Sequence, residues 1–147
     1  MQLVNINNMR GNSSFIYLED VHCILLKRKR YMFYWEFYNN ISDTNFIVSR
    51  NLKSSIEAKE WLKNIYKNNI DLYNEFTNVH DLKGKSALIH LDCVKCIDLI
   101  RENSRFYWGF FNSIESEHCV NSMNFKCITT ANKWLKEILK NEKNKSI

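Results

Sequence analysis

The side chains that could bind a metal ion gather in the second half of the chain. Cys93 and Cys96 form a Cys-x-x-Cys pair, with His90 before it. Later candidates are His118, Cys119 and Cys127. These are the residue types of a zinc site. Residues three apart in a strand point to opposite faces, however, so His90, Cys93 and Cys96 converge only if the chain turns near Cys93. Because a single Cys-x-x-Cys pair is weak support, the sequence predicts neither a metal ion nor another cofactor.

The remaining short motifs do not assemble a catalytic site. Gly84-Lys85-Ser86 has the ending of a phosphate-binding P-loop, but that motif needs a glycine five residues earlier, where Val79 stands. Glu19 and Asp92 occupy matching places in the two halves of the chain, in a segment where a turn is expected. Such a carboxylate more often accepts backbone hydrogen bonds than acts as an acid or base. The sequence therefore predicts a protein that is not an enzyme.

Two aromatic segments suggest a binding surface. Phe33-Tyr34-Trp35-Glu36-Phe37 and Phe106-Tyr107-Trp108-Gly109-Phe110 have strand character, and alternate residues of a strand face opposite sides. One face is large and apolar and predicts the core. The other face carries Tyr34, Tyr38, Tyr107 and Phe111. Bases of single-stranded nucleic acid stack on such rings for roughly 1–3 kcal/mol each. The alternative is that the other half of the chain or a partner subunit covers this face.

Basic side chains flank the first aromatic segment. Lys27, Arg28, Lys29 and Arg30 precede it, where a hairpin tip is expected, and Arg101 is the one basic residue at the matching place in the second half. Lys59 and Lys63 lie four residues apart in a predicted helix, where like charges cost a few tenths of a kcal/mol. These residues are the predicted contacts to phosphate groups. The alternative for the lysines is an ordinary solvated helix face.

The elements that would position these side chains occur twice. Residues 3–69 align without a gap on residues 76–142, 73 positions later, with roughly 40% identity. Features present in only one copy, including each histidine, Cys93 and Lys85, are thereby set aside. Cys96, by contrast, matches Cys23, which lies in an apolar run and has the character of a small core residue.

Each copy is predicted to consist of short strands followed by one helix. In the first copy the strand-like runs cover residues 3–6, 15–18, 21–26, 32–38 and 45–52, with a corner at Glu19-Asp20. Ala58, Trp61, Leu62 and Ile65 have the spacing of an amphipathic helix, and Ser54 and Glu57 form a capping box. Thr129 or Thr130 is the expected cap of the second helix.

These patterns predict an α+β fold with an internal tandem duplication. Two antiparallel β-sheet units, each ending in one amphipathic helix, are expected to pack as a pseudo-two-fold pair. Residues 1–69 form the first unit, with its helix near 55–68, and residues 70–75 are a short connection. Residues 76–142 form the second unit, with its helix near 129–141, and residues 143–147 are a frayed tail.

The composition limits where the protein acts. No run approaches the roughly 20 apolar residues that a membrane span needs, and the first residues lack the pattern of a secretory signal. The number of cysteines is odd, and only Cys23 and Cys96 match between the copies, so a shared disulfide framework is not indicated. The sequence predicts an intracellular, cytoplasmic protein, with the nucleus or an organelle as alternatives. The net charge of +5 permits an anionic partner without requiring one.

The leading functional interpretation is a non-enzymatic binding protein for single-stranded nucleic acid. The layout of several strands and a helix, duplicated and with aromatic strands, is similar to that of single-strand-binding Whirly and PUR-type domains. One alternative is a protein-interaction module, either a subunit of an assembly, homo-oligomers included, or an inhibitor that docks on a host factor. Another is a nucleotide-binding pocket between the two copies, which would require a concave cleft lined by both.

Overall fold

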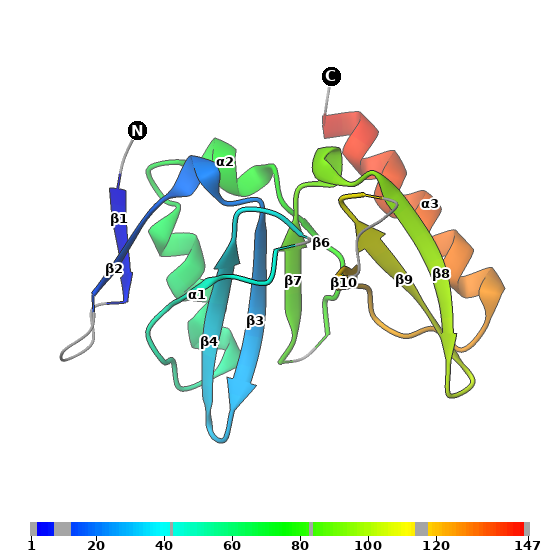
Figure 1. The fold of residues 1–147 in the computed structure, drawn as a ribbon, viewed down its shortest axis with the longest axis horizontal. Helices are drawn as coiled ribbons and strands as arrows, with labels where there is room; N and C mark the ends of the chain where they lie inside the picture. The colour runs from blue at the N-terminus through cyan, green and yellow to red at the C-terminus, as the bar shows by residue number, and fades with distance from the viewer. Residues whose placement is uncertain (1–2, 8–12, 42, 83, 114–117, 146–147) are drawn as a thin grey trace.

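The computed structural model describes the chain except for residues 1–2, 8–12, 42, 83, 114–117 and 146–147 (Figure 1). It is an α+β protein with several antiparallel sheets and few helices. None of the described helices combines the length and apolar character that crossing a bilayer requires.

The described part of the first half contains five strands, a short 3-10 turn and one long helix. In chain order these are β1 (Leu3–Asn7), β2 (Ser14–Tyr17), η1 (Leu18–Asp20), β3 (Cys23–Lys29), β4 (Met32–Tyr38), β5 (Ile47–Val48) and α1 (Ser55–Ile65). The corner expected at Glu19-Asp20 is the turn η1, which separates β2 from β3.

The connection between the halves is itself helical, because α2 (Ile70–Asn74) fills most of it. The second half continues with β6 (Thr77–Asn78), β7 (Ser86–Ile89), η2 (Leu91–Cys93), β8 (Cys96–Glu102), β9 (Arg105–Phe111), β10 (Val120–Asn121) and α3 (Ile128–Lys145). Helix α3 extends into the segment predicted to be a frayed tail, and residues 146–147 lie outside the described part.

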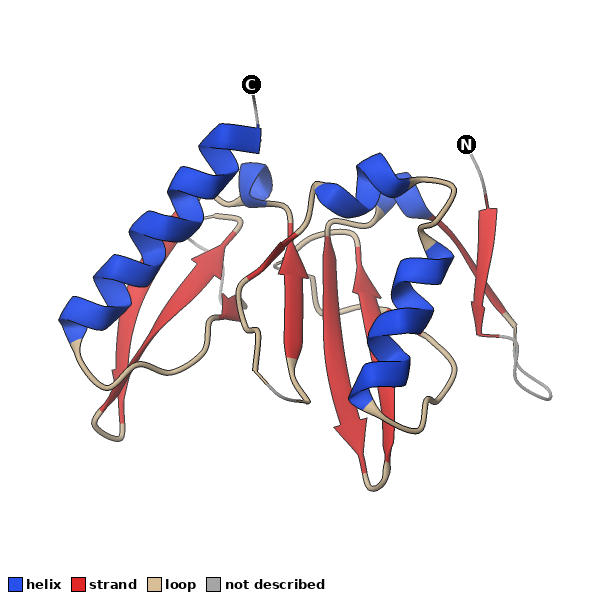
Figure 2. Ribbon diagram, turned by 180° about the vertical axis from the view of Figure 1, so that it is seen from behind, coloured by secondary structure: helices blue, strands red, loops and turns tan. Residues whose placement is uncertain are grey.

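The described strands form three antiparallel sheets. β1 and β2 form a two-stranded ribbon, and β10, β9 and β8 form a three-stranded sheet. The largest sheet has the order β5-β4-β3-β7-β6, so it takes strands from both halves of the chain. Its middle is the seam, in which Cys23–Leu26 of β3 pair with Ser86–Ile89 of β7. Figure 2 shows both long helices on the same side of the strands.

The β3–β4 and β8–β9 hairpins close without glycine. Lys29 pairs with Met32 and Glu102 with Arg105, which leaves two residues in each loop. Asn103 and Ser104 have φ values of 52° and 62°, as a tight hairpin turn of matching twist requires. Arg30 has φ 58° in the first loop. Lys27, Arg28 and Lys29, expected at the hairpin tip, instead belong to β3, and only Arg30 lies in the loop.

The core lies between the sheets and the two long helices. In β4, Trp35 and Phe37 are buried, and Trp108 and Phe110 are buried in β9. This is the apolar face that the alternation predicts. The indole N–H of Trp35 donates to the carbonyl of Ala58 in α1 at 2.9 Å, which ties the helix to the sheet. Trp108 donates to Ala131 of α3 at the same distance.

The helix starts differ in part from the expectation. Ser54 caps α1 by accepting a hydrogen bond from the Glu57 backbone at 3.1 Å, as the capping box predicts. The Glu57 carboxylate accepts from the Lys53 backbone rather than from Ser54. Helix α3 begins at Ile128, so the expected caps Thr129 and Thr130 lie inside it, and Cys127 precedes its first residue.

Candidate functional site

The four rings predicted to stack bases are divided between two sheets. Tyr34 and Tyr38 belong to β4, whereas Tyr107 and Phe111 belong to β9, and all four are half-buried. The Tyr38 hydroxyl donates to Glu36 Oε1 at 2.7 Å, and its ring lies 5.3 Å from that of Phe46. Burial, followed by the hydrogen bond to Glu36, raises the pKa of Tyr38. The Tyr38 side chain is thus held by Glu36 and packed against Phe46.

The matching face of the second half is filled by its own side chains. A Cβ atom at Gly109 would lie 2.9 Å from Ile100 Cδ1 and 3.0 Å from Phe111 Cε1, so these two side chains occupy the space above the glycine. The Tyr107 hydroxyl donates to Glu102 at 3.1 Å. A side chain at Gly109, where the first half has Glu36, would therefore require Ile100 and Phe111 to shift.

The predicted basic residues fall into separate groups. Lys27, Arg28, Lys29 and Arg30 are exposed, and so is Arg101. The guanidinium of Arg28 lies 5.7 Å from the ring centre of Phe33, and that of Arg101 lies 5.7 Å from Phe106. These are matching cation–π contacts. On α1, Lys59 lies 3.8 Å from Asp81, and Lys63 is exposed.

A cleft of about 490 Å³, here called the junction cleft, opens between the halves. Its polar lining includes Lys27, Arg28, His80, Lys85 and Asn121. Burial lowers the pKa of His80, opposed by a hydrogen bond with the Asn121 backbone, and Lys85 lowers it further. The sequence gives no support for a shared role of Lys85, because Asn12 stands 73 positions before it. The structure instead places Lys85 beside Lys27 and Arg28 across the junction.

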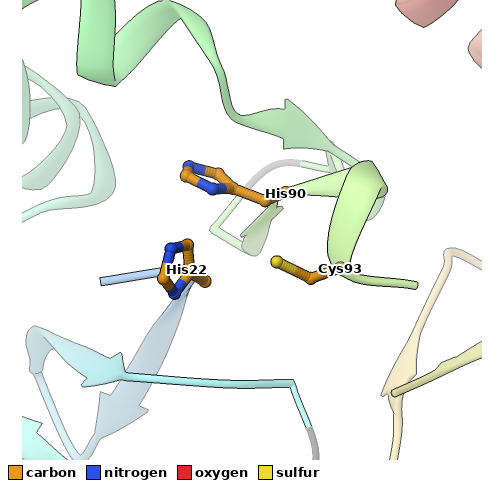
Figure 3. A group of neighbouring side chains, drawn as sticks. All are labelled: His22, His90 and Cys93. Carbon is orange, nitrogen blue, oxygen red and sulfur yellow. The ribbon is translucent and has the colours of Figure 1, made fainter. Parts of the chain in front are cut away.

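A second group of side chains meets at the end of the seam. His22, His90 and Cys93 each offer one possible metal-binding atom, and these atoms all lie within 4.8 Å of one another (Figure 3). Cys96, the second cysteine of the Cys-x-x-Cys pair, is not part of this group. The third member of the group, His22, comes from the other half of the chain. Spacing along the sequence could not have identified it, because β3–β7 pairing alone brings His22 to His90.

The outer edges of the sheets form a third candidate site. Among the described strands, β2 pairs only with β1, and β8 pairs only with β9. These edges lie at opposite ends of the molecule (Figure 1). Large apolar side chains are exposed beside β2 at Leu3, Phe15, Tyr17, Phe46 and Ile47. Four of them, all but Leu3, line one concave surface with a volume of about 620 Å³. Exposed apolar groups beside an unpaired strand edge are typical of a protein-binding surface.

Comparison with known proteins adds no functional assignment. No protein-family model matches the chain, and neither curated proteins nor solved structures gave a match.

Proposed function

We propose that this chain is a tandem duplication whose open ends make it a non-enzymatic protein-interaction module, assembling head-to-tail with further copies of itself. The duplication is supported by elements that coincide after a shift of 73 residues. Strands β3, β4 and β5 then fall on β8, β9 and β10. The ribbons agree in register too, since Val4 pairs with Ile16 and Thr77 pairs with Ile89.

The proposed arrangement of the copies is head-to-tail rather than pseudo-two-fold. A two-fold pair joins equivalent elements, whereas the seam joins β3 to β7. The counterpart of β3 is β8, and the counterpart of β7 is β2. Among the described strands, β2 and β8 each have one open edge, as do β1, β5, β6 and β10. The open edges of β2 and β8 are the ones that correspond to the two sides of the seam. A contact of this kind can repeat without closing.

Burial at the β2 end supports this arrangement. Phe15 is 52% exposed, but its counterpart Leu88 is 8% exposed and packs into the core of the first half. Tyr17 is 41% exposed, whereas its counterpart His90 is 7% exposed. Leu3 and Ile47 are also exposed, and their counterparts are buried. The β2 end therefore retains apolar side chains that would be buried if a preceding copy covered them.

The β8 end shows the complementary pattern. Leu99 is 37% exposed, whereas its counterpart Leu26 is 6% exposed. Leu139 of α3 is 43% exposed, while its counterpart Tyr66 is fully buried and lies 6.0 Å from Phe76. Leu3 is the counterpart of Phe76. Leu139 of one copy and Leu3 of the next are thus the pair expected to repeat the Tyr66–Phe76 contact.

The proposed contact is the antiparallel addition of β2 to β8 of another copy. Transferring the register of the seam places Ile16 opposite Cys96 and Phe15 opposite Ile97. Backbone hydrogen bonds would then satisfy both edges, and Phe15 would enter the partner's core as Leu88 enters the first half. In repeat arrays that do not assemble further, the terminal repeats usually carry a polar outer face. Here both outer faces expose large apolar side chains, which favours continued assembly.

The association should be measured by sedimentation velocity over a range of protein concentrations. The wild-type chain is expected to shift to larger species as concentration rises. Phe15→Glu would place a charge in the contact and is expected to weaken association by more than about tenfold. Tyr31→Glu, at an 85% exposed position in the first hairpin loop, is the matched control and should associate as the wild type does. A wild-type chain that stays monomeric at every concentration would overturn the proposal.

We further propose that the protein acts inside the cell. All five cysteines carry free thiols, and Cys127 is exposed. Exposed free thiols persist in a reducing compartment.

The junction cleft favours single-stranded nucleic acid as a second candidate ligand. Lys27, Arg28 and Lys85 gather there around an opening large enough for a nucleotide. Anisotropy of a labelled single-stranded oligonucleotide is expected to show binding that weakens steeply as salt rises. A Lys27→Ala, Lys85→Ala variant should lower the salt slope by about two, whereas the control Lys133→Ala on α3 should leave it unchanged. No binding at low salt would remove this candidate.

A further inference from the structure

We propose that His22, His90 and Cys93 form a binding site for a transition-metal ion, with zinc as the best chemical match, at the end of the seam. The proposal does not depend on the head-to-tail assembly, because none of the three residues lies among the exposed apolar side chains of the two ends.

The backbone already brings the two histidines together. His22 precedes β3 and His90 follows β7, and the His90 N–H donates to the His22 carbonyl at 3.1 Å. Their rings lie 4.8 Å apart in an edge-to-face arrangement. The turn η2 then returns Cys93 toward both rings, as Figure 3 shows. Three ligands are thereby held by sheet pairing and one tight turn rather than by a long loop.

The spacing suits a tetrahedral ion after small side-chain movements. Metal–nitrogen and metal–sulfur bonds of about 2.0 and 2.3 Å put neighbouring ligand atoms roughly 3.3–3.8 Å apart. In the structure they lie within 4.8 Å of one another. Side-chain rotations that move the ligand atoms by about 1 Å would bring them to this spacing. Two neutral imidazoles and a thiolate are a ligand set that zinc prefers.

The first histidine is oriented as a metal ligand usually is. His22 Nδ1 lies 2.8 Å from the Asn39 carbonyl oxygen, so it carries the proton and donates it there. The same contact leaves the lone pair on Nε2. A backbone carbonyl that fixes the tautomer in this way is a common outer contact of metal-bound histidines.

The second histidine carries an unsatisfied nitrogen. His90 is 7% exposed, and its Nε2 atom is buried without a hydrogen-bond partner among the described residues. The Glu75 carboxylate oxygen Oε2 is 4.0 Å from His90 Nε2, beyond hydrogen-bonding distance. Leaving a buried nitrogen without a hydrogen-bond partner carries an energetic cost, because its hydrogen bonds to water are lost and not replaced. A bound ion would remove that cost, and Glu75 or a water molecule can supply the fourth ligand.

Ring packing alone explains only part of the cluster. His90 also lies 4.3 Å from the ring of Phe76, so its burial has an ordinary packing component. Packing gives no reason for the thiol of Cys93 to face both imidazoles, or for His22 to be held in one tautomer. The metal site accounts for both observations. It also links the two halves of the chain, so the ion is expected to stabilise the seam.

Cobalt is the probe of choice, because it occupies zinc sites and reports thiolate ligation by an ultraviolet charge-transfer band. The reduced, chelator-treated full chain should bind one equivalent of Co²⁺ with that band, and Zn²⁺ should displace it. Cys93→Ser should abolish the band, and His22→Asn should weaken Zn²⁺ binding by more than about tenfold. Cys96→Ser is the matched control and should keep the band. Zn²⁺ should raise the Tm of the wild type but not that of Cys93→Ser.

Two results would overturn the site. One is the absence of the charge-transfer band in the wild type. The other is a band that survives in Cys93→Ser and disappears in Cys96→Ser or Cys127→Ser, which would mean that Co²⁺ binds a different thiol. Circular dichroism of each variant checks folding, and Cys93 is only half-buried, so its replacement by serine should not disrupt the core. Sedimentation with chelator present tests the assembly separately, so one proposal can fail without the other.

Discussion

Two buried serines hold the aromatic strands from outside the sheet. Ser49 accepts a hydrogen bond from the Trp35 backbone at 2.9 Å and donates to the Arg50 carbonyl. Ser122 accepts from the Trp108 backbone at 2.8 Å and donates to the Met123 carbonyl. Both serines are almost fully buried. Each hydroxyl therefore satisfies a buried N–H and a carbonyl at once, and it does so at matching places in the two halves.

Ser49→Ala and Ser122→Ala are expected to destabilise the protein by similar amounts. Each substitution leaves the backbone N–H of a buried tryptophan without a hydrogen-bond partner, at a cost of about 1–3 kcal/mol. Urea unfolding followed by tryptophan fluorescence gives the free energy of unfolding. Thr129→Ala, at an exposed position in α3, serves as the control and should change it by less than about 0.5 kcal/mol. A loss that small for either serine would contradict the assigned role.

Residue types on one strand can be predicted to share a face, but what covers that face cannot. Alternation identified Trp35 and Phe37 as core and placed Tyr34 and Tyr38 together on the second face. The ring of Phe46, which packs on Tyr38, comes from a loop that local pattern does not orient. The same limit hid the metal-binding group, since His22 and His90 are 68 positions apart and meet through strand pairing.

At the scale of elements, the two long helices differ in the residue that precedes their first turn. Ser54 and Cys127 are counterparts that precede the first residues of α1 and α3. Ser54 supplies a hydroxyl acceptor to the first turn. Cys127 Sγ instead lies 3.1 Å from Thr130 Oγ1, and that contact lowers the pKa of the exposed thiol. The sequence predicts Thr129 or Thr130 as the cap, but both lie within α3, which begins at Ile128.

Substitutions at these two positions should change the stability of the protein in opposite directions. Ser54→Ala removes the cap of α1 and should lower the free energy of unfolding by about 1 kcal/mol. Cys127→Ser should raise the Tm, because a serine hydroxyl accepts hydrogen bonds from backbone N–H groups better than sulfur does. Thermal unfolding by circular dichroism, with the exposed Lys53→Ala as control, measures both. A lower Tm for Cys127→Ser would show that α3 is not capped at this position.

Strand positions were more predictable than strand partners. Runs of β-branched and aromatic residues located β3 and β4, whose hairpin register follows from a two-residue loop. The partner of β7 could not be inferred, because β2 and β7 have similar sequences and one is an edge strand while the other is central. Pairing Leu25 with Ala87 depends on how the halves pack, which hydrophobic alternation does not encode.

At the scale of the whole molecule, the proposed assembly joins two ends that expose different side chains. The β2 end presents Phe15 and Tyr17, and the β8 end presents Leu99 and the edge of β8. A contact between unlike ends produces chains of copies, whereas a contact between like ends stops at a dimer. The two kinds of association therefore differ in how they respond when one end is blocked.

Mixing two end-blocked variants tests the central claim most directly. Phe15→Glu blocks the β2 end and leaves the β8 end intact, and Leu99→Glu does the reverse. At a concentration where the wild type forms larger species, each variant alone should sediment as a monomer, and the mixture should form a dimer containing one copy of each. Folding of both variants is checked by circular dichroism. A mixture that remains monomeric, or a single variant that still associates, would contradict head-to-tail assembly.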